Sequence, residues 1–165
     1  MIAFVDTFGD IVTEVSAAYS GTVYYEHGHP LDIVNTLAQK TKSSTYKNKK
    51  YPLIALFQDF LEVSESDNNF LIPEITVIIA TQTDRTYTAA ERYDNTFPTL
   101  YTIMDLLVSK LNTNMKTSWY KWDYEKTDRV FWGKQGLYGS EGNIFNDYID
   151  AIELRIKNIK TLKTC

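Results

Sequence analysis

The sequence contains little of what disulfide-bonded, metal-binding or catalytic proteins require. It has 1 cysteine, Cys165, and 2 histidines among its 165 residues. A single cysteine excludes a disulfide within the chain and predicts folding in a reducing site such as a cytoplasm. No Gly-x-Ser-x-Gly elbow occurs, and so few histidines and cysteines give no context for a nucleophilic triad.

Long hydrophobic runs and an excess of basic residues are also missing. No apolar run approaches the length of a transmembrane helix, so we expect no membrane span. The N-terminus lacks a basic region and Asp6 interrupts it, so we expect no signal peptide. The formal net charge is −4 and the pI is about 5.2, which argues against a dedicated nucleic-acid binder. Lys and Arg supply most of a protein's affinity for DNA phosphates. A mildly acidic protein therefore holds DNA only weakly and still lets it slide past.

Gly133-Lys134 resembles part of a phosphate-binding loop, but the rest of the pattern is absent. Gln135 follows in place of Ser or Thr, and no glycine stands five residues before Gly133. Backbone amides and Lys can therefore not be arranged around phosphates as in a P-loop. We expect neither an enzyme nor a cofactor.

A cluster of possible metal ligands contains Glu26, His27, His29 and Asp32. On an extended segment, the two histidines point to the same face and can form a two-ligand clip for zinc. A structural zinc site needs four ligands, however, and the cysteine is remote in sequence. We therefore favour two ordinary histidines at a strand end before Pro30, and no metal.

The chain is rich in aromatic residues, at 14%, and contains 12 tyrosines. Tyrosine combines an apolar body with a polar tip, which suits broad contact surfaces. A tyrosine-rich sheet explains the same composition, and we favour that interpretation because aromatic residues prefer strands. The length predicts one domain over residues 1–165.

Apolar residues at helical spacing predict two main helices and a short one. The main helices cover Phe4–Tyr19, with Gly21 as its expected end, and the segment from Phe97 to Leu111. The short helix covers Leu31–Ala38. Extended apolar or alternating runs predict the strands, and the polar stretch 64–69 predicts a hairpin between the two central ones. The runs are Thr22–Glu26, Tyr51–Val63, Ile75–Gln82, a segment within Trp119–Trp132, and a half-exposed strand at Tyr148–Ile159.

This order of elements predicts an α+β fold. We expect a mostly antiparallel sheet of four to six strands, with the two main helices packed on it. Two segments are expected to be long loops, Thr81–Thr96 and Gly133–Gly142, and loops of that length are usually functional. They supply our candidates for contacts between subunits, which are Thr83, Asp84, Arg85, Tyr87, Arg92, Tyr93, Gly136, Tyr138 and Gly139.

Two further segments have alternative interpretations. Lys40–Lys50 contains five lysines and no acidic residue; we expect a solvated loop, and the alternative is a patch that meets an acidic partner. Trp119–Trp132 contains all three tryptophans. It can line a pocket for a small molecule or peptide, whereas its interleaved acidic residues oppose stacking on single-stranded nucleic acid.

The element order resembles that of the tail-terminator and tail-completion proteins of tailed bacteriophages. The resemblance covers most of the chain, and three segments carry it. They are Tyr24-Tyr25-Glu26-His27-Gly28-His29-Pro30-Leu31-Asp32-Ile33, Tyr51-Pro52-Leu53-Ile54-Ala55-Leu56, and the closing strand Tyr148–Ile159 after a long glycine-containing loop.

The resemblance implies a structural virion protein that assembles in the host cytoplasm and has no catalytic residues. It implies a homo-oligomeric ring, six- or twelve-fold, at the head–tail junction or neck. Other neck, portal-side or tail proteins would be its partners, and genomic DNA would pass through the lumen without specific binding. The main alternative is a small-molecule or peptide-binding α+β module with an aromatic-lined pocket, and a third is a hydrolase.

Overall fold

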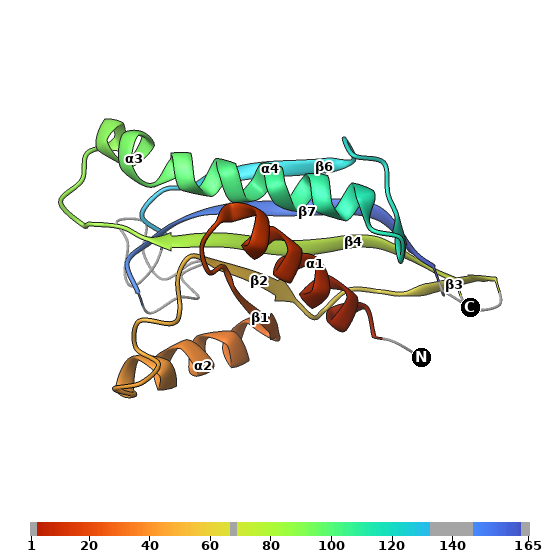
Figure 1. Cartoon of the computed structure of the whole chain (residues 1–165), viewed down its shortest axis with the longest axis horizontal. Helices are drawn as coiled ribbons and strands as arrows, with labels where there is room; N and C mark the ends of the chain where they lie inside the picture. The colour runs from red at the N-terminus through yellow and green to blue at the C-terminus, as the bar shows by residue number, and fades with distance from the viewer. Residues whose placement is uncertain (1–2, 67–68, 133–146, 163–165) are drawn as a thin grey trace.

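The structure is a computed structural model that describes residues 3–66, 69–132 and 147–162. Within these residues, 4 helices and a 7-stranded sheet form an α+β fold (Figure 1). The helices are α1 (Phe4–Tyr19), α2 (Pro30–Lys42), α3 (Ala89–Asn95) and α4 (Phe97–Thr113). The strands are β1 (Tyr24–Gly28), β2 (Leu53–Phe57), β3 (Val63–Ser66), β4 (Asn69–Gln82), β5 (Thr117–Ser118), β6 (Tyr124–Arg129) and β7 (Ile149–Thr161).

The strand order is β1-β2-β4-β7-β5, with β3 also paired to β4 and β6 also paired to β7. The β1–β2 pair is parallel and the other pairs are antiparallel. The sheet is thus mixed, and the expected mostly antiparallel arrangement is matched only roughly, because β1 and β2 pair in parallel. The strand number exceeds the expected four to six for two reasons. The run expected as one strand at Tyr51–Val63 ends at Phe57, and a separate β3 begins at Val63. The short β5 also precedes the segment Trp119–Trp132, in which we expected a strand.

The long β4–β7 pair lies at the centre of the sheet, in register from Phe70↔Thr161 to Gln82↔Ile149. Helices α1 and α4 cover one face of the sheet, and α2 covers part of the other (Figure 1). Alternate residues of the strands therefore face two separate cores. Val77 and Leu154 face α1 and α4, whereas Ile78 and Ala151 face the α2 side.

Local sequence explains the helix ends. Pro30 occupies the first turn of α2, where a missing N–H costs nothing, and the His29 side chain accepts a hydrogen bond from the Leu31 N–H. The end of α1 differs from our expectation, because Ser20 rather than Gly21 adopts the left-handed cap conformation, with φ of 60°. A short polar residue can substitute for glycine there.

The alternation of faces is interrupted once in the β4–β7 pair. Residues three apart on a strand should face opposite sides, yet Ile156 and Ile159 belong to the same core. Ile72 and Ile75 on β4 match them, also three apart and in that core. Between the two isoleucines of β7, Asn158 has a φ of 56°. This left-handed residue resets the face, so the core beneath α1 and α4 continues as far as Ile72 and Ile159.

We predict that Asn158→Ala lowers the free energy of unfolding by about 1–2 kcal/mol more than Asn158→Gly. Both variants remove the hydrogen bond from Asn158 to Asp123, so their difference isolates the backbone conformation. Urea unfolding of the two variants measures it. Equal losses would show that the left-handed backbone at this position is not the constraint.

Candidate interaction surfaces

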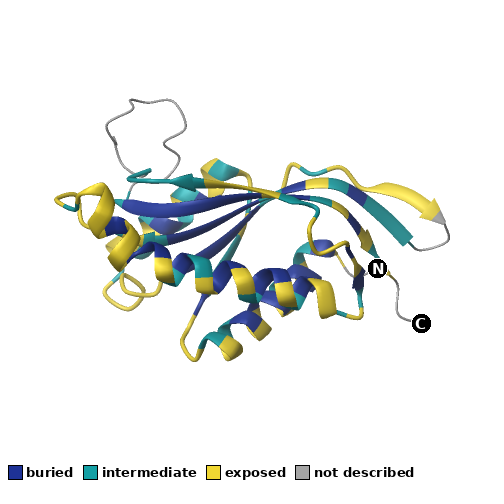
Figure 2. Ribbon diagram, turned by 90° about the horizontal axis from the view of Figure 1, so that it is seen from above, coloured by how far each residue is buried: buried dark blue, intermediate teal, exposed yellow. Residues whose placement is uncertain are grey.

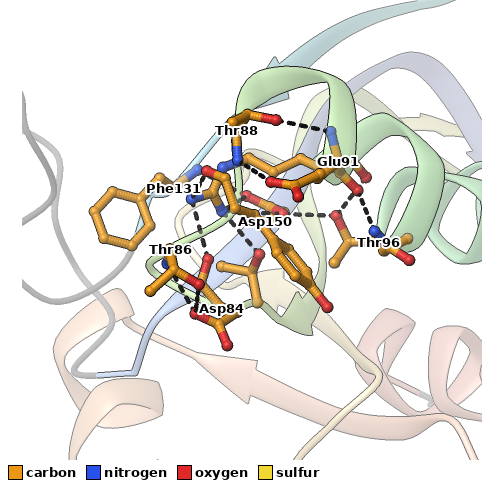
Figure 3. Close-up of polar contacts among 11 residues, drawn as sticks. Asp84, Thr86, Thr88, Glu91, Thr96, Phe131 and Asp150 are labelled. Atoms are coloured by element: carbon orange, nitrogen blue, oxygen red, sulfur yellow. Dashed lines mark hydrogen bonds and ion pairs between the residues drawn. The ribbon is translucent and has the colours of Figure 1, made fainter.

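The segment Thr81–Thr96 is not the long loop that we expected from its sequence. Strand β4 continues to Gln82, and α3 begins at Ala89, so the connection spans only residues 83–88. A capping box begins α3: the Thr88 Oγ1 accepts from the Glu91 N–H at 3.3 Å, and the Thr88 N–H donates to Glu91 Oε2 at 2.7 Å (Figure 3). Thr-x-x-Glu is a sequence signature of a helix start, and it could have identified α3.

Arg92, one of our candidate contact residues, is instead buried at 4% exposure. Its Nη1 donates to Thr83 Oγ1 at 2.8 Å and to Asp150 Oδ1 at 3.2 Å. Its Nη2 donates to the backbone carbonyls of Asp84 and Tyr87, each at 3.1 Å. The guanidinium therefore holds the 83–88 connection and α3 against β7. Arg92 thus shapes this surface from the inside, because its side chain is almost fully buried within the subunit.

Asp150, at the start of β7, completes the buried cluster around Arg92 (Figure 3). Its carboxylate accepts from Thr96 Oγ1 at 2.6 Å and from the Phe131 N–H at 2.8 Å. The Phe131 ring also lies 4.8 Å from the guanidinium carbon of Arg92. A buried ion pair is tolerated when its remaining donors and acceptors are bonded, and here they join α3, the end of β6 and β7.

The exposed part of this region has an ordered surface. Asp84 and Arg85 are exposed, and Thr83 and Tyr87 are half-buried. The Asp84 carboxylate accepts hydrogen bonds from the backbone N–H of Thr86 at 2.8 Å and from the Thr86 hydroxyl at 2.7 Å. These two bonds, the first more than the second, lower the pKa of Asp84. The candidates Gly136, Tyr138 and Gly139 lie outside the described residues, as does the whole Gly133–Gly142 segment.

Tyr93 belongs to a second polar cluster, which joins the helices to β6. Its hydroxyl donates to Asp128 Oδ2 at 3.0 Å, and the Tyr101 hydroxyl donates to the same atom at 2.8 Å. Lys126 Nζ pairs with Asp128 Oδ1 at 2.7 Å. Desolvation acts to raise the pKa of Asp128, but the hydrogen bonds from Lys126 and the two tyrosines outweigh it and lower that pKa.

The three tryptophans do not share one environment. Trp119 is buried in the core beneath α1 and α4, and its Nε1 donates to the Lys157 carbonyl at 2.9 Å. Trp132 packs against the core on the opposite face. Trp122 is 64% exposed, beside the exposed Tyr120. They therefore do not line a common pocket, although aromatic spacing alone had suggested one.

The lysine-rich segment is ordered and only partly a loop, because α2 extends to Lys42. Lys50 is buried, and its Nζ donates to Thr41 Oγ1 at 2.8 Å and to Asp147 Oδ2 at 2.7 Å. Lys40 pairs with Glu26. Two of the five lysines thus anchor the segment at its ends. The lysine loop, residues 43–49, projects between these anchors.

The two histidines have structural partners. His29 caps α2, and His27 Nδ1 lies 2.7 Å from Gln58 Oε1. Within residues 3–66, 69–132 and 147–162, no three metal-ligating side chains gather into a possible metal site. Over the same residues, every helix is too short or too polar to cross a membrane.

No protein-family model matches the sequence, and no curated protein is significantly similar to it. Function must therefore be inferred from the surfaces of the molecule itself.

We predict that Arg92→Met lowers the free energy of unfolding by about 3–5 kcal/mol, because it leaves the Asp150 carboxylate buried without its cation. Arg92→Met combined with Asp150→Asn should recover at least about 1 kcal/mol of this loss. Asn removes the orphaned charge and can still accept from the Phe131 N–H. Urea unfolding measures both. Additive losses in the double variant would contradict a charge pair as the stabilising element.

We predict that Asp128→Asn lowers the free energy of unfolding by about 1 kcal/mol at pH 7. A carboxyl whose pKa is lowered by folding stabilises the protein above its unfolded pKa, and this stabilisation is lost as the pH falls through the folded pKa. The difference from wild type should therefore be constant above about pH 5 and shrink toward pH 2. Asp94→Asn, on the exposed surface of α3, is the control. A difference independent of pH would refute the role given to the carboxylate.

Proposed function

We propose that the chain is a structural subunit of a ring at the head–tail junction or neck of a tailed bacteriophage. One observation carries this proposal, namely a sheet extension that projects from the molecule with exposed apolar side chains. We call it the arm and define it as residues 59–66 together with Asn69–Leu71. The element order described above, which resembles that of tail-terminator and tail-completion proteins, gives the biological setting.

The arm exists because the two central strands, β4 and β7, are longer than the other strands of the sheet. Strands β4 and β7 have 14 and 13 residues, whereas β2 and β6 have 5 and 6. On the side of β4 that faces β2, the N-terminal end of β4 pairs only with β3. The β3–β4 hairpin extends past the helices (Figure 2). A strand exposed in this way receives little packing within its own subunit.

Two exposed apolar side chains support an interaction role for the arm. Leu61 is 64% exposed and Val63 is 42% exposed. At the base of the arm, the Phe60 ring packs edge-on against Phe4 of α1, with centroids 5.5 Å apart. The base is thus fixed to the body while the apolar side chains face solvent. Clustered apolar side chains on a projecting element are typical of protein–protein contacts.

In the proposed ring, the arm of each subunit meets a different surface of the next copy and the contact is not returned between the same two copies, so the interface is heterologous. Repeated contacts of this type close into a ring when the rotation between neighbours permits. Direct pairing of sheet edges is less well supported. Four of the 6 residues of β6 are charged, and charged edge strands oppose pairing with another chain. The net charge of −4 suits a lumen through which DNA passes without specific binding.

Negative-stain images and native mass measurement of the purified chain at high concentration test the proposal. We expect a closed ring, with six or twelve copies as in the family that the chain resembles. Monomers only, both alone and with neck proteins of the same phage, would contradict it.

We predict that Leu61→Ser with Val63→Ser weakens self-association at least about tenfold, because the lost apolar burial exceeds about 1.4 kcal/mol. Sedimentation equilibrium measures the association. Leu31→Ser is the matched control, because Leu31 is also 64% exposed but lies at the start of α2. Equal effects of the two substitutions would exclude a specific role of the arm.

A further inference from the structure

Two neighbouring stretches of the sequence carry charge of opposite sign. Residues 40–50 contain five lysines and no acidic residue, whereas residues 51–84 contain no lysine or arginine. In the fold, these stretches supply two different surfaces. Figure 1 shows the lysine loop near one end of the long axis of the molecule and β3, in the arm, near the other.

The lysine loop presents unpaired positive charge. Lys47 and Lys49 are exposed, and neither forms an ion pair with any described residue. Tyr46 is 51% exposed, and the Lys49 Nζ lies 5.4 Å from the centre of its ring. An aromatic face beside an ammonium group suits a partner that combines apolar and acidic side chains.

The conformation of the lysine loop is fixed by local hydrogen bonds. The Lys47 N–H donates to the Ser43 carbonyl at 3.0 Å, and the Lys49 N–H donates to the Tyr46 carbonyl at 2.9 Å. The Ser43 hydroxyl accepts from the Tyr46 N–H at 3.3 Å. Together with the buried Lys50, these contacts order the loop before any partner binds. A preordered surface loses less conformational entropy on association.

The arm has the complementary chemistry. Its exposed Leu61 and Val63 are flanked by the exposed carboxylates of Asp59 and Glu62. Neither of these carboxylates forms an ion pair within the described residues. Glu65, by contrast, already pairs with Lys160 at 3.0 Å. Asp59 and Glu62 therefore remain available for a cation on another molecule.

We infer that the lysine loop of one copy of this chain receives the arm of the next copy. Lys47 and Lys49 would face Asp59 and Glu62, while Tyr46 packs against the exposed apolar side chains of the arm. A second copy is the occupant because both complementary surfaces occur on every chain, at opposite ends, so the contact repeats without any other protein. The inference deepens the proposed ring and rests on it, since it names the two surfaces that meet.

Two charge-reversed variants test this contact. One carries Lys47→Glu and Lys49→Glu, and the other carries Asp59→Lys and Glu62→Lys. Each places like charges in the interface, so each should weaken self-association at least about tenfold. Asp94→Lys with Asp105→Lys is the matched control for the second variant, because it changes the net charge by the same amount and in the same direction at exposed positions elsewhere. Circular dichroism spectra and thermal unfolding verify that all variants fold.

Mixing the two reversed variants gives a sharper test. In a 1:1 mixture, the unaltered arm of the first variant meets the unaltered loop of the second. The reversed surfaces also complement each other. Native mass measurement should therefore show mixed assemblies with the two variants in equal number, while each variant alone stays monomeric. Association of the wild type should also weaken between 0.05 and 0.5 M salt, because salt screens exposed charges.

The outcomes separate this inference from the proposed function. If the wild type forms rings but neither reversed variant differs from the control, the loop–arm contact is refuted while the ring stands. If the reversed variants dissociate but their mixture does not reassemble, the direct pairing of these surfaces is refuted. If the wild type is monomeric at high concentration and low salt, both the ring and the contact are refuted.

Discussion

The fold depends on the antiparallel pairing of β4 with β7, which joins residues 70–82 to residues 149–161. Every other strand attaches directly or through β2 to this pair. Its register also decides which residues enter which core, since a shift of one residue would turn Val77 and Leu154 away from α1 and α4. At one end of the pair, Asp150 accepts the hydrogen bonds of the buried cluster around Arg92. At the other end, the strands continue into the arm.

Much of this architecture was predictable from apolar spacing. The periods of α1 and α4 place both helices correctly because each buries a continuous apolar face, which for α4 includes Leu100, Ile103 and Leu107. Apolar spacing also predicts the final strand, but it does not predict how deeply that strand is buried. Alternation predicted a half-exposed strand at Tyr148–Ile159, whereas Asp150 and Glu153 are buried. Their ion-pair partners are Arg92 and Arg129. Arg92 is distant from Asp150 in the sequence, and the sequence indicates the pairing of Arg129 with Glu153 only weakly.

The candidate sites were harder to predict. The polar segment 81–96 lacks a helical period because α3 has only 7 residues and is fixed mainly by its capping box and by Arg92. Charge and polarity suggested that Arg92 was exposed, but tertiary contacts with Asp150 reverse that expectation. The lysine-rich segment shows the same limit. Composition does not distinguish its five lysines from one another. In the structure, however, Lys50 is buried and Lys47 is exposed. The arm was not predicted, because its projection depends on strand lengths that become clear only in the sheet.

In the proposed ring, opposite ends of neighbouring subunits meet, with an anchored lysine loop at one end and an acidic, apolar arm at the other. The most direct measurement is zero-length carbodiimide crosslinking of assembled protein made from equal amounts of ¹⁴N- and ¹⁵N-labelled chains. We expect amide crosslinks between copies that join Lys47 or Lys49 to Asp59 or Glu62. Assemblies in which these lysines crosslink only within their own chain, or to other carboxylates, would contradict this expectation.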